Sequence, residues 1–309
     1  MSKLTQQDIM SVKANGFLRN RGTDNFSMRI STPGTVFTAE DFINISELSK
    51  KYGNGKVICT SRLGVEIPGI PFNKIPEAME FAKSHGIRYG GTGAKVRPIA
   101  ACKGMTCVFG NCDTHAIAKK IDEEYFVGWT SVKLPHKFKI CVGGCPNSCM
   151  KPSLNDFGIE GHRIPEYNSE LCRGCQSCAV ENACPVKAAK VVDGKLVIGE
   201  NCIGCGVCIG KCPFKAVAHE GKTVYKIFVG GTWGKTSRNG TPLSRYVTED
   251  EIYPLLEKTM LWFKKHAYAK ERLGKAIDRI GVDAFENELW SDELLNHKDE
   301  ILLSEIKNA

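Results

Sequence analysis

Residues 137–152 read KFKICVGGCPNSCMKP, and the rest of the chain is best interpreted outward from this stretch. Lys137 and Lys139 alternate with apolar residues, which predicts a strand with both lysines on one face. A Gly-Gly pair then lets the backbone turn tightly and approach a bulky object. Cys145 and Cys149 follow with three residues between them, so two thiolates on one turn can reach a single metal centre.

The turn GCPNSC at residues 144–149 resembles the sulfite and nitrite reductases that couple a sirohaem to a 4Fe–4S cluster. The hallmark of that family is one cysteine pair, a gap, and a Cys-x3-Cys pair inside a G-C-P-N-x-C turn. The resemblance implies that Cys145 and Cys149 are cluster ligands and that Cys149 also bridges to the sirohaem iron. A pair of buried free thiols is the alternative interpretation.

An upstream group supplies the other two ligands that the resemblance requires. A glycine-rich turn at residues 90–93 precedes Arg97 and Cys102, which is the order found in the family. The family has its next cysteine after five residues, whereas here Cys107 follows after four and Cys112 after another four. We favour Cys102 with Cys107, because Cys102 keeps its position behind the arginine. Cys107 with Cys112 stays open as the alternative pair.

Residues 172–213 contain two ferredoxin motifs, C-x2-C-x2-C-x5-C-P and C-x2-C-x2-C-x3-C-P. In two-cluster ferredoxins the fourth cysteine of each run ligates the other cluster. Zinc ribbons fit poorly, because eight cysteines with two Cys-Pro ends do not suit two zinc sites. We therefore assign Cys172, Cys175, Cys178 and Cys212 to cluster I, and Cys184, Cys202, Cys205 and Cys208 to cluster II.

The assignments use twelve of the 15 cysteines for three 4Fe–4S clusters and leave Cys59, Cys112 and Cys141 free. We expect Cys59 and Cys141 to be packed thiols. Metal clusters explain so many cysteines better than disulfides do, because no export signal points to an oxidising compartment.

The formal net charge of the 309-residue chain is +8, and no Lys/Arg-rich run indicates a nucleic-acid site. We interpret the excess of cations as serving an anionic cofactor and an anionic substrate. The chain has no N-terminal apolar segment behind a basic start and no run of 18 apolar residues, so we expect a cytoplasmic protein without a membrane span.

The resemblance also implies two groups of cations around the sirohaem. The group that binds the substrate anion is expected to consist of Arg29, Arg97, Lys137 and Lys139. The group that contacts the carboxylates of the sirohaem is expected to consist of Arg62 and Arg238. Solvated surface arginines are the alternative for Arg29 and Arg238. Clustered cations lower each other's pKa, which makes a lysine a better proton donor.

The expected fold class is α+β: by resemblance, a sulfite/nitrite reductase repeat with a mixed sheet, flanking helices and an inserted ferredoxin-like domain with two 4Fe–4S clusters. Residues 1–88 would form the N-terminal ferredoxin-like half. Residues 89–167 and 222–309 would form the sirohaem/4Fe–4S domain, and residues 168–221 the insertion. Strands are predicted on both sides of the insertion, so we expect these strands to share one sheet.

Local patterns place further elements. A strand is predicted at residues 56–62 and a helix at residues 113–125. Capping-box patterns at Thr38 and Thr248 each begin a predicted helix. The inward side of the first of these helices is expected to contain Phe42, Ile45, Leu48 and Tyr52.

Together these features predict the six-electron reduction of sulfite to sulfide, with electrons entering through the ferredoxin clusters from a reductase subunit or a soluble ferredoxin. Nitrite reduction to ammonia at the same site is the alternative activity. A non-catalytic electron carrier is a third possibility, but a carrier needs no anion pocket. Larger members of the family contain two copies of the repeat. The single copy here predicts a homodimer in which the cations of one protomer act on the sirohaem of its partner. Convergence of all groups within one chain is the competing arrangement.

Overall fold

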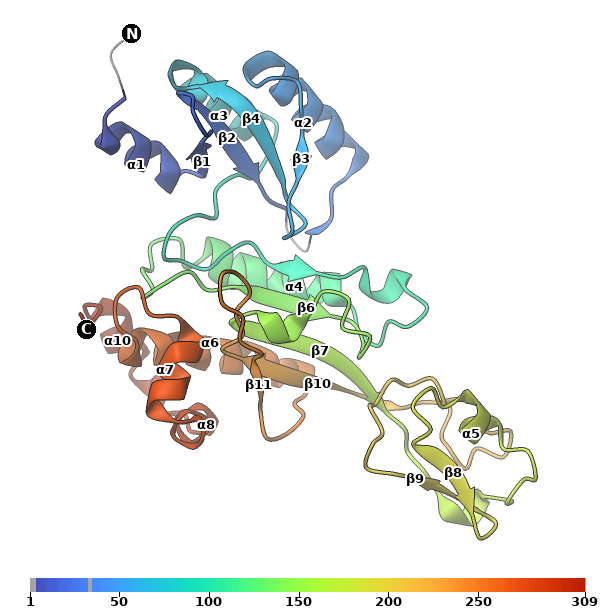
Figure 1. Cartoon of the computed structure of the whole chain (residues 1–309). Coiled ribbons are helices and arrows are strands. Elements are labelled where there is room, and N and C mark those ends of the chain that lie inside the picture. The colour runs from blue at the N-terminus through green and yellow to red at the C-terminus, as the bar shows by residue number, and fades with distance from the viewer. Residues whose placement is uncertain (1–3, 33–34, 309) are drawn as a thin grey trace.

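The computed structural model describes residues 4–32 and 35–308, which fold into three parts (Figure 1). Each part has its own sheet, of four, five and two strands. Each sheet also has its own hydrophobic core, and the largest core belongs to the five-stranded central sheet. Strands and helices are mixed in all three parts, so the predicted α+β class is confirmed.

The N-terminal part is an antiparallel sheet in the order β1-β2-β4-β3, and two helices, α2 and α3, cover one of its faces (Figure 1). Thr38 and Asp41 form the predicted capping box at the start of α2. The elements of this part are α1 (Gln6–Ala14), β1 (Phe17–Arg19), β2 (Asn25–Ile30), α2 (Ala39–Tyr52), β3 (Ile58–Cys59), β4 (Val65–Pro71) and α3 (Ile75–Ser84).

Three predictions in this part are wrong. Phe42 is 55% exposed, because the buried face of α2 begins at Ile45. The strand predicted at residues 56–62 is reduced to the two residues of β3, which forms an edge of the sheet and is exposed. Cys59 lies on that edge and is therefore an exposed thiol instead of a packed one.

The central part is a mixed sheet in the order β11-β10-β7-β6-β5. The strands β5, β6 and β7 are parallel to one another, whereas β10 and β11 are antiparallel. Its strands are β5 (Ala100–Ala101), β6 (Ile140–Gly143), β7 (Phe157–Ile164), β10 (Lys222–Val229) and β11 (Thr241–Pro242). Its helices are α4 (Thr114–Ile121), a π-helical turn (Asp122–Val127), α6 (Glu249–His266), α7 (Leu273–Ile280), α8 (Val282–Trp290), α9 (Glu293–Asn296) and α10 (Lys298–Leu303).

The strand predicted to include Lys137 and Lys139 begins later than expected. The first residue of β6 is Ile140, and Phe138 makes only an isolated bridge with Val96. Both lysines consequently lie in the connection that leads into the sheet. The capping box predicted at Thr248 is present at the start of α6.

The third part is inserted between two adjacent strands. β7 and β10 pair along their whole length, from Phe157 opposite Val229 to Ile164 opposite Lys222. The chain leaves the end of β7, forms α5 (Ala179–Ala183), β8 (Ala189–Val192) and β9 (Lys195–Ile198), and returns at the start of β10. Figure 1 shows this insertion projecting from the far end of the two strands. The strands on both sides of the insertion therefore share one sheet, as predicted.

Single 3₁₀ turns lie in the connections, at Phe72–Lys74, Gly104–Thr106, Pro152–Leu154 and Ser169–Leu171. None of the helices within the described residues is both long enough and apolar enough to cross a membrane.

Candidate functional site

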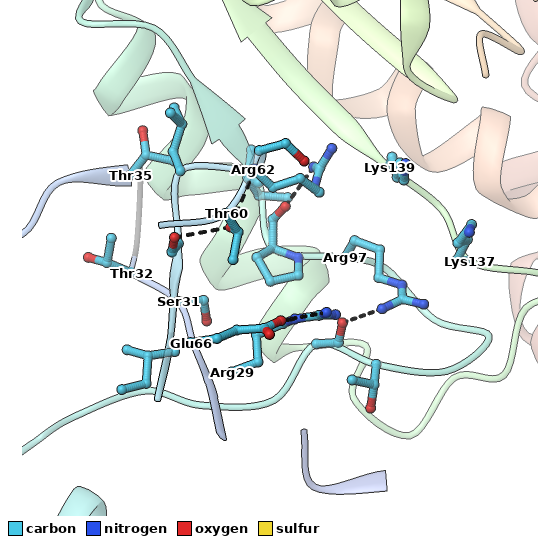
Figure 2. Close-up of a pocket in the computed structure, with 18 of the residues that line it drawn as sticks. Arg29, Ser31, Thr32, Thr35, Thr60, Arg62, Glu66, Arg97, Lys137 and Lys139 are labelled. Atoms are coloured by element: carbon cyan, nitrogen blue, oxygen red, sulfur yellow. Dashed lines mark hydrogen bonds and ion pairs between the residues drawn. The ribbon is translucent and has the colours of Figure 1, made fainter. Parts of the chain in front are cut away.

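A cationic cavity of about 390 Å³ lies between the N-terminal sheet and the central sheet (Figure 2). Its charged side chains come from α1, β2, the β3–β4 loop, β4 and the segments that precede β5 and β6. Glu66 is the one acid among its described lining residues. The cations that line it are Lys13, Arg29, Arg62, Arg97, Lys137 and Lys139.

Arg29 and Arg97 lie on one side of this cavity (Figure 2). Arg29 is paired with Glu66, its neighbour across β2 and β4, through Nε at 2.9 Å and Nη2 at 2.8 Å. Arg97 donates one hydrogen bond to the carbonyl oxygen of Gly91, and its buried Nε has no partner among the described residues. Burial, followed by the charges of Arg29 and Arg62, lowers the pKa of Arg97 to about 10. The free donor of Arg97 suits an anionic ligand.

Lys137 and Lys139 lie on the opposite side, and neither ammonium has a hydrogen bond or ion pair within the described residues. Burial is the main cause of the lowered pKa of Lys137. Burial and then the charges of Arg62 and Lys137 lower the pKa of Lys139 to about 8. Lys139 is therefore a cation near neutral pH that can give up its proton easily.

A buried ion pair behind the cavity fixes the segment with the two lysines. The backbone N–H of Lys139 donates to Asp156 Oδ2 at 2.8 Å. Arg272 Nη2 contacts both oxygens of the same fully buried carboxylate, at 2.9 and 2.8 Å. Sequence reasoning missed Asp156 and Arg272. They are 116 residues apart and belong to no motif, so no local signal could have paired them.

Arg62 joins the N-terminal part to the central part. Its guanidinium donates to Asn155 Oδ1 at 3.0 Å and to the carbonyl oxygens of Pro98 and Ile140 at 2.8 and 3.0 Å. Its Nε is buried and has no partner in the part of the chain that the structure describes. Arg62 thus has a structural role, and one donor remains for a ligand in the cavity. Its contact with a cofactor carboxylate stays a prediction.

Arg238 is not brought to this cavity. Its guanidinium is paired with Asp278, with a shortest distance of 2.6 Å, and donates to the carbonyl oxygens of Val229, Gly230 and Asn239. It is not among the described residues that line the cavity. The expected contact with sirohaem therefore lacks structural support, because α7 supplies a counter-charge that the local sequence does not reveal.

A second cavity, of about 910 Å³, adjoins the cationic one and is lined by Cys102, Cys107, Cys145 and Cys149. Thr35, Thr60, Leu63 and Gly64 belong to the linings of both cavities. The backbone N–H groups of Gly144 and Gly104 point at Cys102 Sγ, at 3.2 and 3.5 Å. Hydrogen bonds to the sulfur atoms are among the features that set the reduction potential of a 4Fe–4S cluster.

Two further cysteines nearby are packed into the core. Burial raises the pKa of Cys112 to about 12, and its Sγ lies where a side chain at Gly161 would have to be. Cys141 is 1% exposed and its thiol donates to the carbonyl oxygen of Met150. Cys112 is thus not among the described residues that line the cysteine cavity, and the choice of Cys102 with Cys107 stays a prediction.

A third depression connects the two cavities. Arg62 and Lys139 from the cationic cavity and Cys149 from the cysteine cavity line it together. Cations and cluster cysteines therefore meet within a single chain. This geometry supports the arrangement in which each site is built by one protomer.

Four cysteines of the insertion also line a shared cavity. Cys184, Cys202, Cys205 and Cys208, which are the four residues assigned to cluster II, line one small cavity. Although burial opposes it, backbone N–H groups lower the pKa of Cys184, and Ala188 N lies 3.2 Å from its Sγ.

Backbone N–H groups also donate hydrogen bonds to a cysteine of the cluster I set. Backbone N–H groups, those of Gly174 and Leu196 above all, lower the pKa of Cys172. No three His, Cys, Asp or Glu side chains of the described residues are close enough together to hold a single metal ion. Four separated cysteines with backbone donors suit a 4Fe–4S cluster, which takes four thiolate ligands.

Comparisons with protein families match nearly the whole chain. The nitrite and sulphite reductase 4Fe-4S domain matches residues 92–298, and the nitrite/sulfite reductase ferredoxin-like half domain matches residues 19–85.

Several curated proteins are similar. The coenzyme F420-dependent sulfite reductase of Methanocaldococcus jannaschii is 31% identical over 278 residues, which are 89% of this chain and 44% of that protein. A subunit of the anaerobic sulfite reductase of Salmonella typhimurium is 28% identical over 320 residues and matches 94% of this chain and 90% of its own length. A nitrite reductase of Emericella nidulans is 22% identical, with 90% of this chain and 20% of that protein matched. The chain thus spans less than half of the first and third of these relatives.

Solved structures show a similar fold. The crystal structure of dissimilatory sulfite reductase I aligns with a TM-score of 0.68 and 21% identity, over 92% of this chain and 72% of that one. The NirA protein of Mycobacterium tuberculosis aligns with a TM-score of 0.66 and 14% identity, over 99% of this chain and 49% of that one.

Proposed function

Because the chain belongs to the nitrite and sulfite reductase family, we propose that it reduces sulfite to sulfide at a sirohaem bound beside a 4Fe–4S cluster. The observation that carries the proposal is the meeting of Arg62, Lys139 and Cys149 around one depression. An electron carrier needs no such pocket of cations. The names of the relatives favour sulfite as the substrate, and the nitrite reductase among them makes nitrite the second candidate.

The residues present fit the proposed cofactors. The cationic cavity contains buried arginine donors without partners and only one acid, which suits a macrocycle with many carboxylates. The sirohaem iron, when bound, supplies the site at which the substrate is held and reduced. The residues that would hold the adjoining cluster are Cys102, Cys107, Cys145 and Cys149.

The cations would bind and orient the substrate anion. Two unit charges 4 Å apart interact by about 4 kcal/mol at an effective dielectric of about 20. Arg97, Lys137 and Lys139 each keep a donor without a partner in the described structure, so they can contact the oxygens of a small anion. Arg29 is held by Glu66 and adds charge from the rim.

Lys139 would supply protons at the oxygen atoms that leave as water. Its lowered pKa, about 8, lies close to neutral pH, where a general acid is both protonated and able to donate. Asp156 and Arg272 keep its backbone in place, so the ammonium has a defined position. Lys137, whose pKa is also lowered, mainly by burial, can restore the proton.

Electrons would come from a separate reductase subunit or ferredoxin through the cysteine sets of the insertion. The Salmonella typhimurium relative is named as one subunit of an anaerobic sulfite reductase, which is consistent with a separate donor subunit. The clusters would receive one electron at a time, and six electrons complete the reduction of one sulfite.

The test uses protein purified and reconstituted under anaerobic conditions. We expect the visible spectrum to contain sirohaem bands in addition to those of the clusters, and we expect sulfide as the product with reduced methyl viologen as the donor. Lys139→Gln should abolish most of this turnover, while Lys119→Gln on the exposed side of α4 should not. Protein that carries its clusters but binds no sirohaem would refute the proposal. Faster turnover of nitrite, with ammonia as the product, would support the second candidate.

A further inference from the structure

The two cysteine sets of the insertion differ in what they contact. For the cluster I set, the hydrogen bonds of Cys172, Cys178 and Cys212 within the described structure all stay inside the insertion. The loop of residues 202–208, which carries three cysteines of the cluster II set, lies instead against the end of β7. One set is therefore held against the central part, whereas the contacts of the other stay within the insertion.

Backbone contacts fasten this loop to β7. The N–H of Arg163 donates to the carbonyl oxygen of Gly204 at 2.7 Å, and Arg163 forms a parallel bridge with Cys205. Gly204 has a φ of +60°, and a Cβ there would lie 3.1 Å from Nδ1 of His162. The loop and the strand are thus in contact without space between them.

The side chain of His162 contacts the same loop. Its Nδ1 lies 2.9 Å from the carbonyl oxygen of Ile203, and its Nε2 lies 3.1 Å from Glu160 Oε1. The ring is 3% exposed and Glu160 is 6% exposed. A carbonyl oxygen only accepts, so Nδ1 is the donor in the contact with Ile203. Glu160 therefore fixes the ring in the orientation that binds the loop.

Asn111 completes the contact on the side of the Cys102–Cys149 set. Its backbone N–H donates to the carbonyl oxygen of Gly144 at 2.8 Å, and its side chain donates to that of Gly161 at 3.4 Å. A Cβ at Gly206 would lie 3.2 Å from Asn111 Oδ1. Gly206 follows Cys205 in the chain, and Gly144 precedes Cys145. A single asparagine thus lies between the neighbours of two cysteines from different sets.

Resting on the function proposed above, we propose that electrons leave the insertion from the Cys184, Cys202, Cys205 and Cys208 set and cross to the Cys102–Cys149 set at this contact. His162 and Asn111 are positioning residues for the crossing. One electron passes at a time: iron of the insertion set is oxidised and iron of the Cys102–Cys149 set is reduced. No bond is made or broken, and no proton moves. The external donor would then pass its electrons to the other set, which consists of Cys172, Cys175, Cys178 and Cys212.

The experiment mixes the full-length, reconstituted protein with a reduced two-cluster ferredoxin, which is too large to enter the cavities. Rapid-freeze EPR follows the clusters of the insertion and of the central part separately. In His162→Ala and in Asn111→Ala we expect the second phase, reduction of the central cluster, to slow about 10- to 100-fold, the range found when outer-shell residues around a metal centre are removed. The first phase and the iron content should not change.

Matched variants separate positioning from a general loss of structure. His219→Ala removes a histidine that contacts the carbonyl oxygen of Cys212 in the cluster I set, and it should leave both phases unchanged. His162→Asn keeps a donor for the carbonyl oxygen of Ile203 and should restore most of the second phase. Hydrogen exchange at the amide of Arg163 reports on the hydrogen bond to Gly204 and does not depend on turnover. We expect this exchange to accelerate in His162→Ala and to stay unchanged in His219→Ala and His162→Asn.

An unchanged second phase in both His162→Ala and Asn111→Ala would overturn the inference, as would an equal slowing in His219→Ala. If His162→Ala lost iron, the result from Asn111→Ala would decide, because Asn111 touches no cysteine assigned to the insertion. Dithionite, which is small enough to enter the cavities, should still support sulfite reduction in every variant. Failure of wild-type protein with both donors would refute the proposed function instead.

Discussion

Lys139 illustrates at the residue scale how a motif acquires its chemistry from its surroundings. Its ammonium is half-buried, surrounded by Arg62, Lys137 and Arg272, and opposed mainly by the already paired Asp156. Burial first, and then the neighbouring cations, favour loss of its proton and lower its pKa to about 8.

This shift predicts the pH dependence of the reaction. The proton of Lys139 is present below about pH 8 and is lost as the pH rises through that value, so kcat/KM should decline there. Nitrite is the better substrate for this measurement, because sulfite itself changes protonation near neutral pH. A bound anion favours the ammonium, so the decline in kcat should occur at a higher pH. Lys139→Gln should lower kcat/KM about 100-fold or more and remove the decline. A decline that persists in Lys139→Gln would assign it to another group.

A second prediction at this scale concerns the cysteine choice. Cys102→Ser should remove about four irons, because a 4Fe–4S cluster needs its four thiolates. Cys112→Ser should keep all clusters, since that thiol is buried and is not among the described residues that line the cavity. Iron and acid-labile sulfide analysis measures both. The opposite result, with iron lost from Cys112→Ser and kept in Cys102→Ser, would show that the ligand assignment is wrong.

At the scale of elements, the pairing of β7 with β10 explains how the cysteine-rich insertion can sit inside another domain. The two strands are neighbours up to Ile164 and Lys222, so the chain can leave and return at one point without disturbing the sheet. The insertion also has its own core, which includes Val180, Leu196 and Val217.

Deletion of the insertion should therefore leave the central part folded. Replacing residues 165–221 with Asn-Gly joins the two strands through a two-residue turn that suits their antiparallel pairing. We expect about eight irons to be lost, at four per cluster. Turnover with reduced methyl viologen should persist, while turnover with reduced ferredoxin should disappear. Cys205→Ser, which keeps the polypeptide complete, is the matched control and should show the same dependence on the donor. An unfolded deletion variant, detected by circular dichroism, would contradict this independence.

At the scale of the whole molecule, cations from the N-terminal part and cysteines from the central part meet in one chain. Arg62 helps to hold the two parts together, because its guanidinium crosses from the β3–β4 loop to Asn155, Pro98 and Ile140. A homodimer that shares its sites is not needed to bring these groups together.

Mixed dimers test this arrangement. One chain carries Lys137→Gln and Lys139→Gln, and the other carries Cys149→Ser, so that each is inactive alone. When sites are built within single chains, every site in the mixture is defective, and we expect no recovery of sulfite reduction. Mixed wild-type and Cys149→Ser chains serve as the control and should retain activity in proportion to the wild-type share. Recovery in the first mixture would show that active sites are shared between protomers.

The amino-acid sequence by itself determined the features that depend on neighbours in the chain. The ferredoxin motifs, the GCPNSC turn and the capping boxes at Thr38 and Thr248 act over a few residues, so their spacing alone predicts them. The position of the insertion between two strands followed from the same local patterns.

Only the tertiary structure decided the features that depend on distant partners. It placed Cys107 and Cys102 around one cavity and buried Cys112, paired Arg238 with Asp278, and exposed Cys59 at a sheet edge. Burial and counter-charge determine whether a thiol or a guanidinium is available, and both come from residues remote in the sequence. For the same reason, the carboxylate of Asp156 and the contact between Asn111 and Gly206 were not predictable from any local pattern.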